Sequence, residues 1–196
     1  AQQKVEARNF DIRKTLLKFD NVLNDQRQVI FNQRDNVINN EKNTYANDFL
    51  EEILNDLNKS KTNNMGDPKN NIFKNQMVSI FGKSINEDDI QKLANLDKSK
   101  FNESIKDKFQ NKKKEIIKLV GDDQSKQLEK RIFLQLIDQN WKMHIQYLEQ
   151  LRQVIGLRSF GQRDPLVEYK KESFILFENL LNKLKSDLIT FLINIK

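Results

Sequence analysis

The sequence predicts an all-α protein built from long helices, and three observations carry this prediction. Only 5 of the 196 residues are Gly and 2 are Pro, so few residues would break a helix. Apolar side chains recur at alternating three- and four-residue steps, the spacing of one helix face. Charged residues make up 32% of the chain and apolar ones 37%, which suits thin apolar stripes better than a thick core. We therefore expect an elongated molecule with a long helix, a small helical subdomain and an antiparallel two-helix hairpin.

The long helix is expected from about Val5 to Glu41, in a first domain bounded at residues 1–42. It carries a heptad-like stripe with polar gaps at Asn9, Gln26 and Gln33. The apolar members of this first stripe are Val5, Ile12, Leu16, Phe19, Leu23, Ile30 and Val37. A second stripe beside it consists of Phe10, Leu17, Phe31 and Ile38. Two stripes on one helix indicate several neighbours, some of which we expect to lie outside this chain.

Residues 43–122 are expected to form a small helical subdomain. Its expected helices cover Tyr45 to Leu57, Ile72 to Phe81, Glu87 to Leu96 and Phe101 to Val120, with a polar loop from Asn58 to Asn71. Asn86 can accept a hydrogen bond from a free backbone N–H, so it is a candidate N-cap. Gly121 tolerates a positive φ angle and should end the last of these helices.

Residues 123–196 are expected to form the antiparallel hairpin. One helix is marked by Leu134, Ile137, Trp141, His144, Leu148, Leu151 and Ile155, and the other by Phe174, Phe177, Leu181, Leu184, Leu188, Phe191 and Ile195. Asp164 can cap the second helix, and Pro165 suits a first helical turn. A short connection between two amphipathic helices is typical of such a hairpin, with arms of roughly 45 Å.

Composition limits the classes of function. The chain has no Cys, which excludes disulfides and cysteine-based metal sites within it. We find no apolar run near the ~18–20 residues that span a bilayer. The net charge of +6 is spread along the whole chain, so a solvated basic surface is the simplest interpretation. Because the chain starts at Ala1 without a leader-like segment, we expect it to be a piece of a longer polypeptide.

A search for catalytic motifs leaves no strong candidate. Phe81-Gly82-Lys83-Ser84 resembles the end of a phosphate-binding loop, but position 77 is Met where that motif needs Gly. We therefore expect a turn between two helices there. His144 is the only histidine and lies on the apolar stripe of the hairpin, so we expect a packed or hydrogen-bonded side chain. We predict no catalytic, cofactor-binding or metal-binding residue in this chain.

Charged clusters are given structural interpretations. Asp122-Asp123 and Glu87-Asp88-Asp89 lie near expected helix starts, where negative charge favours the helix dipole. Lys112-Lys113-Lys114 is expected to form a solvated face, because no aromatic residues interleave with it as in nucleic-acid sites. Trp141 is expected to anchor the hairpin, to contact another domain, or to do both.

The loop between the hairpin helices is the most informative feature for function. Phe160 lies between Arg158 and Arg163, and a large apolar side chain at the tip of a stiff hairpin is costly to leave in water. Two interpretations remain open from the residues alone. Phe160 folds back onto the hairpin, or the tip contacts a partner.

Two long blocks of sequence resemble the SecA family, the motor of bacterial preprotein export. The first comprises Val5-Glu6-Ala7-Arg8-Asn9-Phe10-Asp11-Ile12-Arg13-Lys14 and Phe19-Asp20-Asn21-Val22-Leu23-Asn24-Asp25-Gln26-Arg27, which are similar to the family's helical scaffold. The second comprises Asp138 to His144, Leu151-Arg152-Gln153, Leu157-Arg158 and Gln162-Arg163-Asp164-Pro165-Leu166-Val167-Glu168-Tyr169-Lys170, which are similar to its two-helix finger. The resemblance covers the chain and is weak in the middle, where the family has its wing domain.

The resemblance implies a role for each part. Residues 1–42 would be the scaffold helix, 43–122 the wing, and 123–196 the finger hairpin as the second part of the scaffold. The tip residues Arg158, Ser159, Phe160, Gly161 and Arg163 would contact the translocating preprotein and the SecY channel. Arg13, Asp20 and Trp141 would couple the scaffold to the motor.

Further implications concern the longer polypeptide. ATP and Mg²⁺ would bind in motor domains outside this chain, so we expect no cofactor within it. The implied partners are unfolded preprotein, the SecY channel, the motor domains in cis, anionic lipid and a second copy in a homodimer. We do not expect nucleic acid as a partner. The implied location is the cytoplasm, peripherally at the inner face of the bacterial plasma membrane.

The sequence also departs from the family's pattern. Phe160 stands where the family usually has Tyr, so the apolar contact is kept without the hydroxyl. Val154, Gly156, Ser159 and Gly161 stand where Gly, His, Gly and Ala are more frequent, and Met143 replaces a common Glu. An alternative function is a regulatory or dimerisation module that restrains the motor without gripping substrate.

Overall fold

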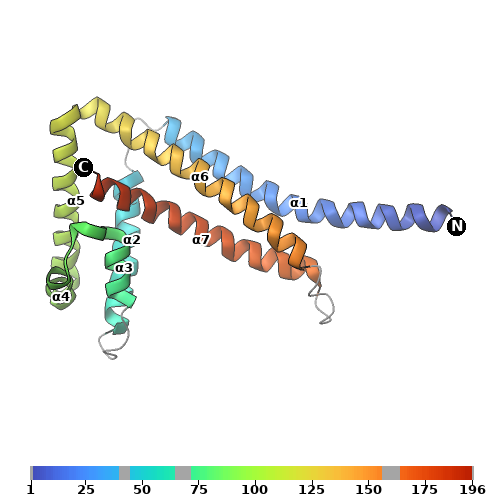
Figure 1. Cartoon of the computed structure of the whole chain (residues 1–196), viewed down its shortest axis with the longest axis horizontal. Coiled ribbons are helices and arrows are strands. Elements are labelled where there is room, and N and C mark those ends of the chain that lie inside the picture. Colours follow the sequence, from blue (N-terminus) through green and yellow to red (C-terminus); the bar gives the residue numbers. More distant parts are fainter. Residues whose placement is uncertain (1, 40–44, 65–71, 156–163, 196) are drawn as a thin grey trace. The chain divides into compact units, whose positions relative to one another are not determined.

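The computed structural model describes residues 2–39, 45–64, 72–155 and 164–195, and every regular element in these ranges is helical (Figure 1). The helices are α1 (Gln2–Asn39), α2 (Tyr45–Asn64), α3 (Ile72–Phe81), a 3₁₀ turn η1 (Gly82–Ser84), α4 (Glu87–Asn95), α5 (Lys98–Val120), α6 (Asp122–Ile155) and α7 (Pro165–Asn194). The all-α prediction is therefore confirmed for the described ranges.

The chain divides into two compact units. The first unit contains residues 1–39 and 137–182, and the second contains residues 40–136 and 183–196. Helices α6 and α7 each contribute residues to both units. The division by sequence into 1–42, 43–122 and 123–196 stays a prediction.

The first unit packs α1 against the end of α6 and the start of α7. Its apolar cluster contains Phe19, Ile155 and Tyr169, with Val22, Leu151 and Leu166 packed beside them. The rings of Phe19 and Tyr169 meet edge to face with their centroids 4.8 Å apart. Contacts of Ile155 with Tyr169 and of His144 with Phe177 make these parts of α6 and α7 antiparallel, as predicted for the hairpin.

The two stripes of α1 differ in burial. Phe19, Ile30 and Val37 of the first stripe are buried, and the polar gap residue Gln26 is buried among them. Phe10, Leu17, Phe31 and Ile38 of the second stripe are exposed by 45% or more. From Phe19 onwards the first stripe is therefore the packing face of α1 in this unit, whereas its member Leu16 is 42% exposed.

The second unit has an aromatic and aliphatic core. Phe81, Phe101, Phe109, Phe133, Leu54 and Met77 are among its side chains that are fully buried. Helix α2 runs on to Asn64, so the expected loop from Asn58 was wrong for its first seven residues. Asn58 is buried and donates to Leu54 O and Asn102 Oδ1, both at 2.7 Å. Lys61 is also buried, donates to Leu96 O and lies over the Phe101 ring.

The predicted helix boundaries mostly hold. Asn86 caps α4 by accepting from Asp89 N at 2.8 Å. Asp164 precedes α7, and its carboxylate accepts from Leu166 N at 2.8 Å. Gly121 ends α5 with a φ angle of 86°, a value that an L-residue side chain would disfavour. Helix α6 begins at Asp122, directly after this glycine.

Candidate functional site

The contacts that join α1 to α6 and α7 form the candidate site of the first unit, which we call the α1 seam. It comprises Phe19, Asp20, Gln26, Arg34, Asp138, His144, Arg152, Tyr169 and Ser173, together with Trp141, which joins the seam by stacking on His144 within α6. Sequence analysis selected two of its members, Asp20 and Trp141, as motor-coupling residues. The seam surrounds the buried gap residue Gln26 and is bordered by charged pairs on its surface.

Asp20 pairs with Arg152 across the seam. The Arg152 guanidinium donates to Asp20 Oδ1 at 3.0 Å, and its carbon lies 5.9 Å from the Phe19 ring centroid. The side chain of Asp20 remains half exposed, whereas Arg152 is less exposed and its guanidinium lies over the Phe19 ring. Asp20 therefore holds the guanidinium of Arg152 in place, while part of the Asp20 carboxylate remains accessible to solvent.

Gln26 binds both helices of the hairpin. Its amide donates from Nε2 to the Ser173 carbonyl at 3.1 Å, and its Oε1 lies 2.7 Å from His144 Nε2. Since Oε1 can only accept, the His144 proton lies on Nε2. The polar gap that sequence analysis noted is thus a bridge between α1, α6 and α7.

His144 is packed between aromatic rings. Its ring stacks on Trp141 at 5.5 Å and lies 5.7 Å from Phe177, and the side chain is buried. Burial lowers the pKa of His144 from 6.5 to about 4, so the imidazole is neutral near pH 7. The prediction of a packed, hydrogen-bonded histidine is confirmed.

The other predicted functional residues have different environments. Arg13 is exposed on α1. Trp141 is half-buried, which leaves part of its ring available on the surface of the unit. The predicted tip residues Arg158, Ser159, Phe160, Gly161 and Arg163 lie outside the described residues. Their roles stay predictions.

The segment that resembles a phosphate-binding loop has a structural role. Gly82 to Ser84 form the 3₁₀ turn between α3 and α4, as expected for a turn. Ser84 Oγ donates to Asn194 Oδ1 at 2.9 Å. A side chain at Gly82 would meet Asn194 at 3.3 Å, at a φ angle of 51°. The turn therefore seats the end of α7 within the second unit.

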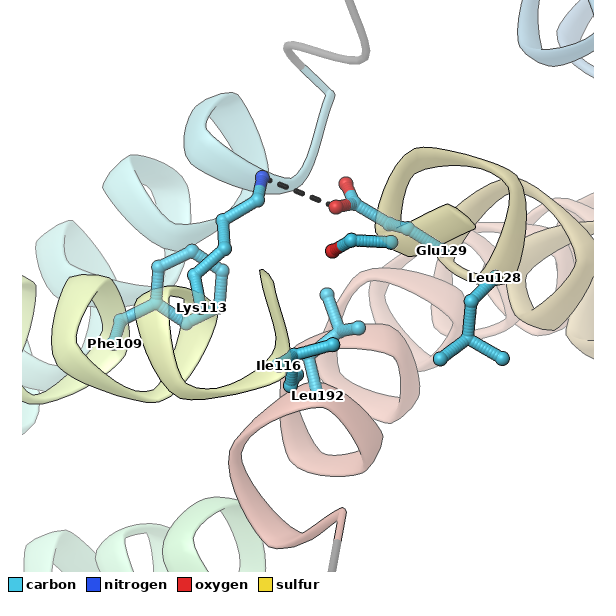
Figure 2. A pocket seen from close by; sticks show the side chains of 7 residues that line it. Phe109, Lys113, Ile116, Leu128, Glu129 and Leu192 are labelled. Carbon is cyan, nitrogen blue, oxygen red and sulfur yellow. Dashed lines mark ion pairs between the residues drawn. The ribbon is translucent and has the colours of Figure 1, made fainter. Parts of the chain in front are cut away.

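The lysine run differs from its prediction at one position. Lys113 binds Glu129 on α6 at 3.0 Å, and the Glu129 side chain is only 3% exposed (Figure 2). Burial raises the pKa of Glu129, and the ammonium of Lys113 opposes that rise. The expectation of a solvated lysine face was therefore wrong for Lys113, because a carboxylate on another helix draws it inward. Sixteen residues separate the two in sequence, and no local pattern could have indicated the pair.

A small cavity adjoins this ion pair. Its lining residues come from α5, α6 and α7 and are Phe109, Lys113, Ile116, Ser125, Leu128, Glu129 and Leu192 (Figure 2). It leaves about 10 Å³ for the centre of a water-sized sphere, which is the room of one water molecule. This cavity is too small for a nucleotide or an organic cofactor.

No group of three or more His, Cys, Asp or Glu side chains within residues 2–39, 45–64, 72–155 and 164–195 could hold a metal ion. Over the same ranges, none of the helices is both long and apolar enough to cross a bilayer.

Comparisons with known proteins give one consistent answer. The sequence family described as the SecA wing and scaffold domain matches residues 1–196. The chain is 59% identical over 197 residues to a protein translocase subunit SecA of Pelagibacter ubique, covering 100% of this chain and 23% of that protein. Subunits of the same name from Alcanivorax borkumensis and Solibacter usitatus are 37% and 35% identical over 98% of this chain. The chain spans about a fifth of the length of these curated relatives, namely 20–23%.

Proposed function

This chain belongs to the SecA family as its wing and scaffold region, and we propose that it transmits nucleotide-driven motion within an ATP-driven protein translocase. In this proposal residues 1–42 are the scaffold helix, 43–122 the wing and 123–196 the two-helix finger. The match to the SecA wing and scaffold family over all 196 residues is the observation that carries the proposal. The motor's ATP and Mg²⁺ would bind in other parts of the longer polypeptide.

The build of the first unit supports a mechanical role. Helix α1 has 38 residues and is about 57 Å long at 1.5 Å per residue. It contacts the hairpin through the aromatic pair Phe19–Tyr169 and the buried Gln26 bridge. A displacement of α1 by a motor would therefore move this part of the hairpin with it. Arg13, Asp20 and the exposed part of Trp141 are the positions at which we propose that the motor acts.

The loop between the two finger helices, here called the fingertip, is proposed to contact the preprotein. Phe160 would supply an apolar contact, and Arg158 and Arg163 would supply positive charge around it. Ser159 and Gly161 would complete the contact surface for the preprotein and the SecY channel. Because a hydrophobic contact is not directional, such a tip could hold segments of varied sequence.

The proposed setting is the bacterial plasma membrane. The longer polypeptide would work in the cytoplasm, bound peripherally at the inner membrane face through SecY and anionic lipid. The net charge of +6 on this chain favours contact with anionic lipid. The remaining proposed partners are unfolded preprotein, the motor domains in cis and a second copy of the protein.

A substitution at the tip tests the substrate-handling role. In the full-length translocase, Phe160→Gly should slow preprotein translocation at least tenfold while ATP binding stays within twofold of wild type. Translocation would be measured as protease-protected preprotein in membrane vesicles, and ATP binding by nucleotide fluorescence. Phe174→Gly, which removes an exposed phenylalanine of α7, is the matched control. Undiminished export by Phe160→Gly would refute this role.

A second function is favoured by the exposed stripe on α1. Phe10, Leu17, Phe31 and Ile38 present an apolar face to solvent in this chain. As a regulatory or dimerisation module, the chain would use such a face to restrain the motor or to bind a second copy. Sedimentation of the full-length protein at several concentrations, with ATPase rates measured in parallel, tests this alternative. Phe31→Ser should then shift the dimer equilibrium or raise the basal ATPase rate, and leave fingertip crosslinking unchanged.

A further inference from the structure

Apolar packing by itself leaves the axial position of α1 undetermined. Leu16, Leu23, Ile30 and Val37 recur at intervals of seven residues along the first stripe. Sliding α1 by seven residues moves it about 10 Å along its axis and places three of these four side chains where another of them stood. Heptad stripes of this kind tolerate such a slip unless polar groups forbid it.

Three polar pairs distinguish the observed position. Asp20 pairs with Arg152, Gln26 with His144, and Arg34 with Asp138. The residue numbers rise along α1 as they fall along α6, so one antiparallel register satisfies all three pairs. Gln26 and His144 are buried, whereas both ion pairs lie nearer the surface.

A slide by one heptad in either direction is opposed by this pattern. When each residue of α1 takes the place of the residue seven positions before it, Arg27 replaces Asp20 and faces Arg152. Gln26 then enters the apolar site that Phe19 occupies beside Tyr169. In the other direction Arg13 faces Arg152. Phe19 then replaces Gln26, and the His144 Nε2–H and the Ser173 carbonyl lose their partner. Each slip therefore brings together like charges and leaves buried polar groups unsatisfied.

We propose that Asp20–Arg152, Gln26–His144 and Arg34–Asp138 form a registry lock that holds α1 at a single axial position on the hairpin. The buried Gln26 is its central element, comparable to a polar residue in the seam of a coiled coil that fixes register. All six residues of the lock lie in the first unit. The proposal of a lock therefore does not depend on the function of the longer polypeptide.

The sequence indicates how the lock could be opened. In Gln26→Leu/Arg152→Glu, a slide by seven residues brings Gln33 to the partner position of His144. It also brings Arg27 to the new carboxylate and places the introduced leucine in the apolar site of Phe19. The partly exposed pair Arg34–Asp138 is lost, and Glu41 takes the place of Arg34 near the exposed Asp138, at a cost that solvent screens. This variant should therefore adopt the shifted register.

Distances between paired spin labels measure the register directly. The chain has no native cysteine, so labels can be attached to cysteines introduced at the exposed Gln28, Gln139 and Gln150. In Gln26→Leu/Arg152→Glu, we expect the 28–150 distance to shorten and the 28–139 distance to lengthen by up to about 10 Å. Unchanged distances for both label pairs in this folded variant would overturn the proposal.

A charge exchange keeps the proposal testable if that variant fails to fold. Asp20→Arg and Arg152→Asp should each lower the denaturation midpoint, and the exchange Asp20→Arg/Arg152→Asp should recover at least half of the loss. Spin-label distances in the exchanged protein should equal those of wild type. Failure of the exchange to recover the midpoint would remove this pair from the lock and refute it.

Discussion

At the residue scale, buried polar side chains determine which helices of this chain pack together and in which position. His144 is neutral, donates to Gln26 and lies between two aromatic rings. Glu129 is buried and pairs with Lys113, whose ammonium opposes the rise in pKa that burial causes. In both cases the partner lies on a different helix, so removing Gln26 or Lys113 leaves His144 or Glu129 buried without that partner.

The stability of the first unit should decrease in acid because of His144. The folded pKa of about 4 lies below the unfolded value of 6.5. The stabilisation is therefore complete above pH 6.5 and is lost as the pH falls towards 4, by about 3 kcal/mol in total. Urea unfolding followed by the fluorescence of Trp141, the sole tryptophan, measures this loss. His144→Gln should weaken the dependence over this window, and an unaltered dependence would contradict the assignment.

The Lys113–Glu129 pair predicts a strongly non-additive response. Lys113→Met leaves a carboxylate buried in the second unit and should reduce the free energy of unfolding by about 3–5 kcal/mol. Lys113→Met/Glu129→Leu should recover most of that loss, because no charge then remains buried. Lys114→Met, at an exposed position in the same run, is the control and should change stability by less than about 0.5 kcal/mol. Denaturation followed by circular dichroism compares the three variants, and equal losses in the single and double variants would refute the pairing.

At the scale of the helices, local caps set where some helices begin, and contacts between residues distant in sequence set how far α2 extends. The caps at Asn86 and Asp164 follow from residue type and position alone, and sequence analysis identified both. The extension of α2 to Asn64 depends on Asn58 and Lys61, whose partners Asn102 and Leu96 lie more than thirty residues away. Such partners are not visible in a local pattern, and the polar composition therefore suggested a loop.

The last turns of α2 should depend on Asn58. Asn58→Ala removes its bonds to Leu54 O and Asn102 Oδ1, leaves the Asn102 acceptor without this donor, and should cost about 1–3 kcal/mol. Asn55→Ala, at an exposed position of the same helix, gains helix propensity and should be neutral or slightly stabilising. Thermal unfolding compares the two variants. Equal effects would mean that propensity, and not the buried contact, sets the length of α2.

The first stripe of α1 was predicted from its periodicity, but the roles of its polar gaps were not. Phe19, Ile30 and Val37 are buried as a heptad pattern requires. Gln26 was noted as an interruption, although it is buried and joins three helices. The residue type and position were a usable signal, because a glutamine inside an apolar seam needs partners. The identity of those partners required the fold.

At the scale of the whole molecule, the family and the all-α class follow from the sequence, because long motifs and long helices both leave clear patterns. The chain is a wing and scaffold region that spans 20–23% of its relatives. The exposure of Phe10, Leu17, Phe31 and Ile38 agrees with the prediction that some neighbours of α1 lie outside this chain. In the proposed function, α1 receives motion from the motor and the fingertip transmits it to the preprotein.

The most direct test of this account is site-specific photocrosslinking from position 160 in the full-length translocase during preprotein translocation. A photoreactive residue at the exposed Lys142 of α6 serves as the matched control. We predict ATP-dependent crosslinks from position 160 to the moving preprotein, and few or none from position 142. Crosslinks from position 160 only to the motor domains or the channel would contradict substrate handling by the fingertip and would favour the regulatory module.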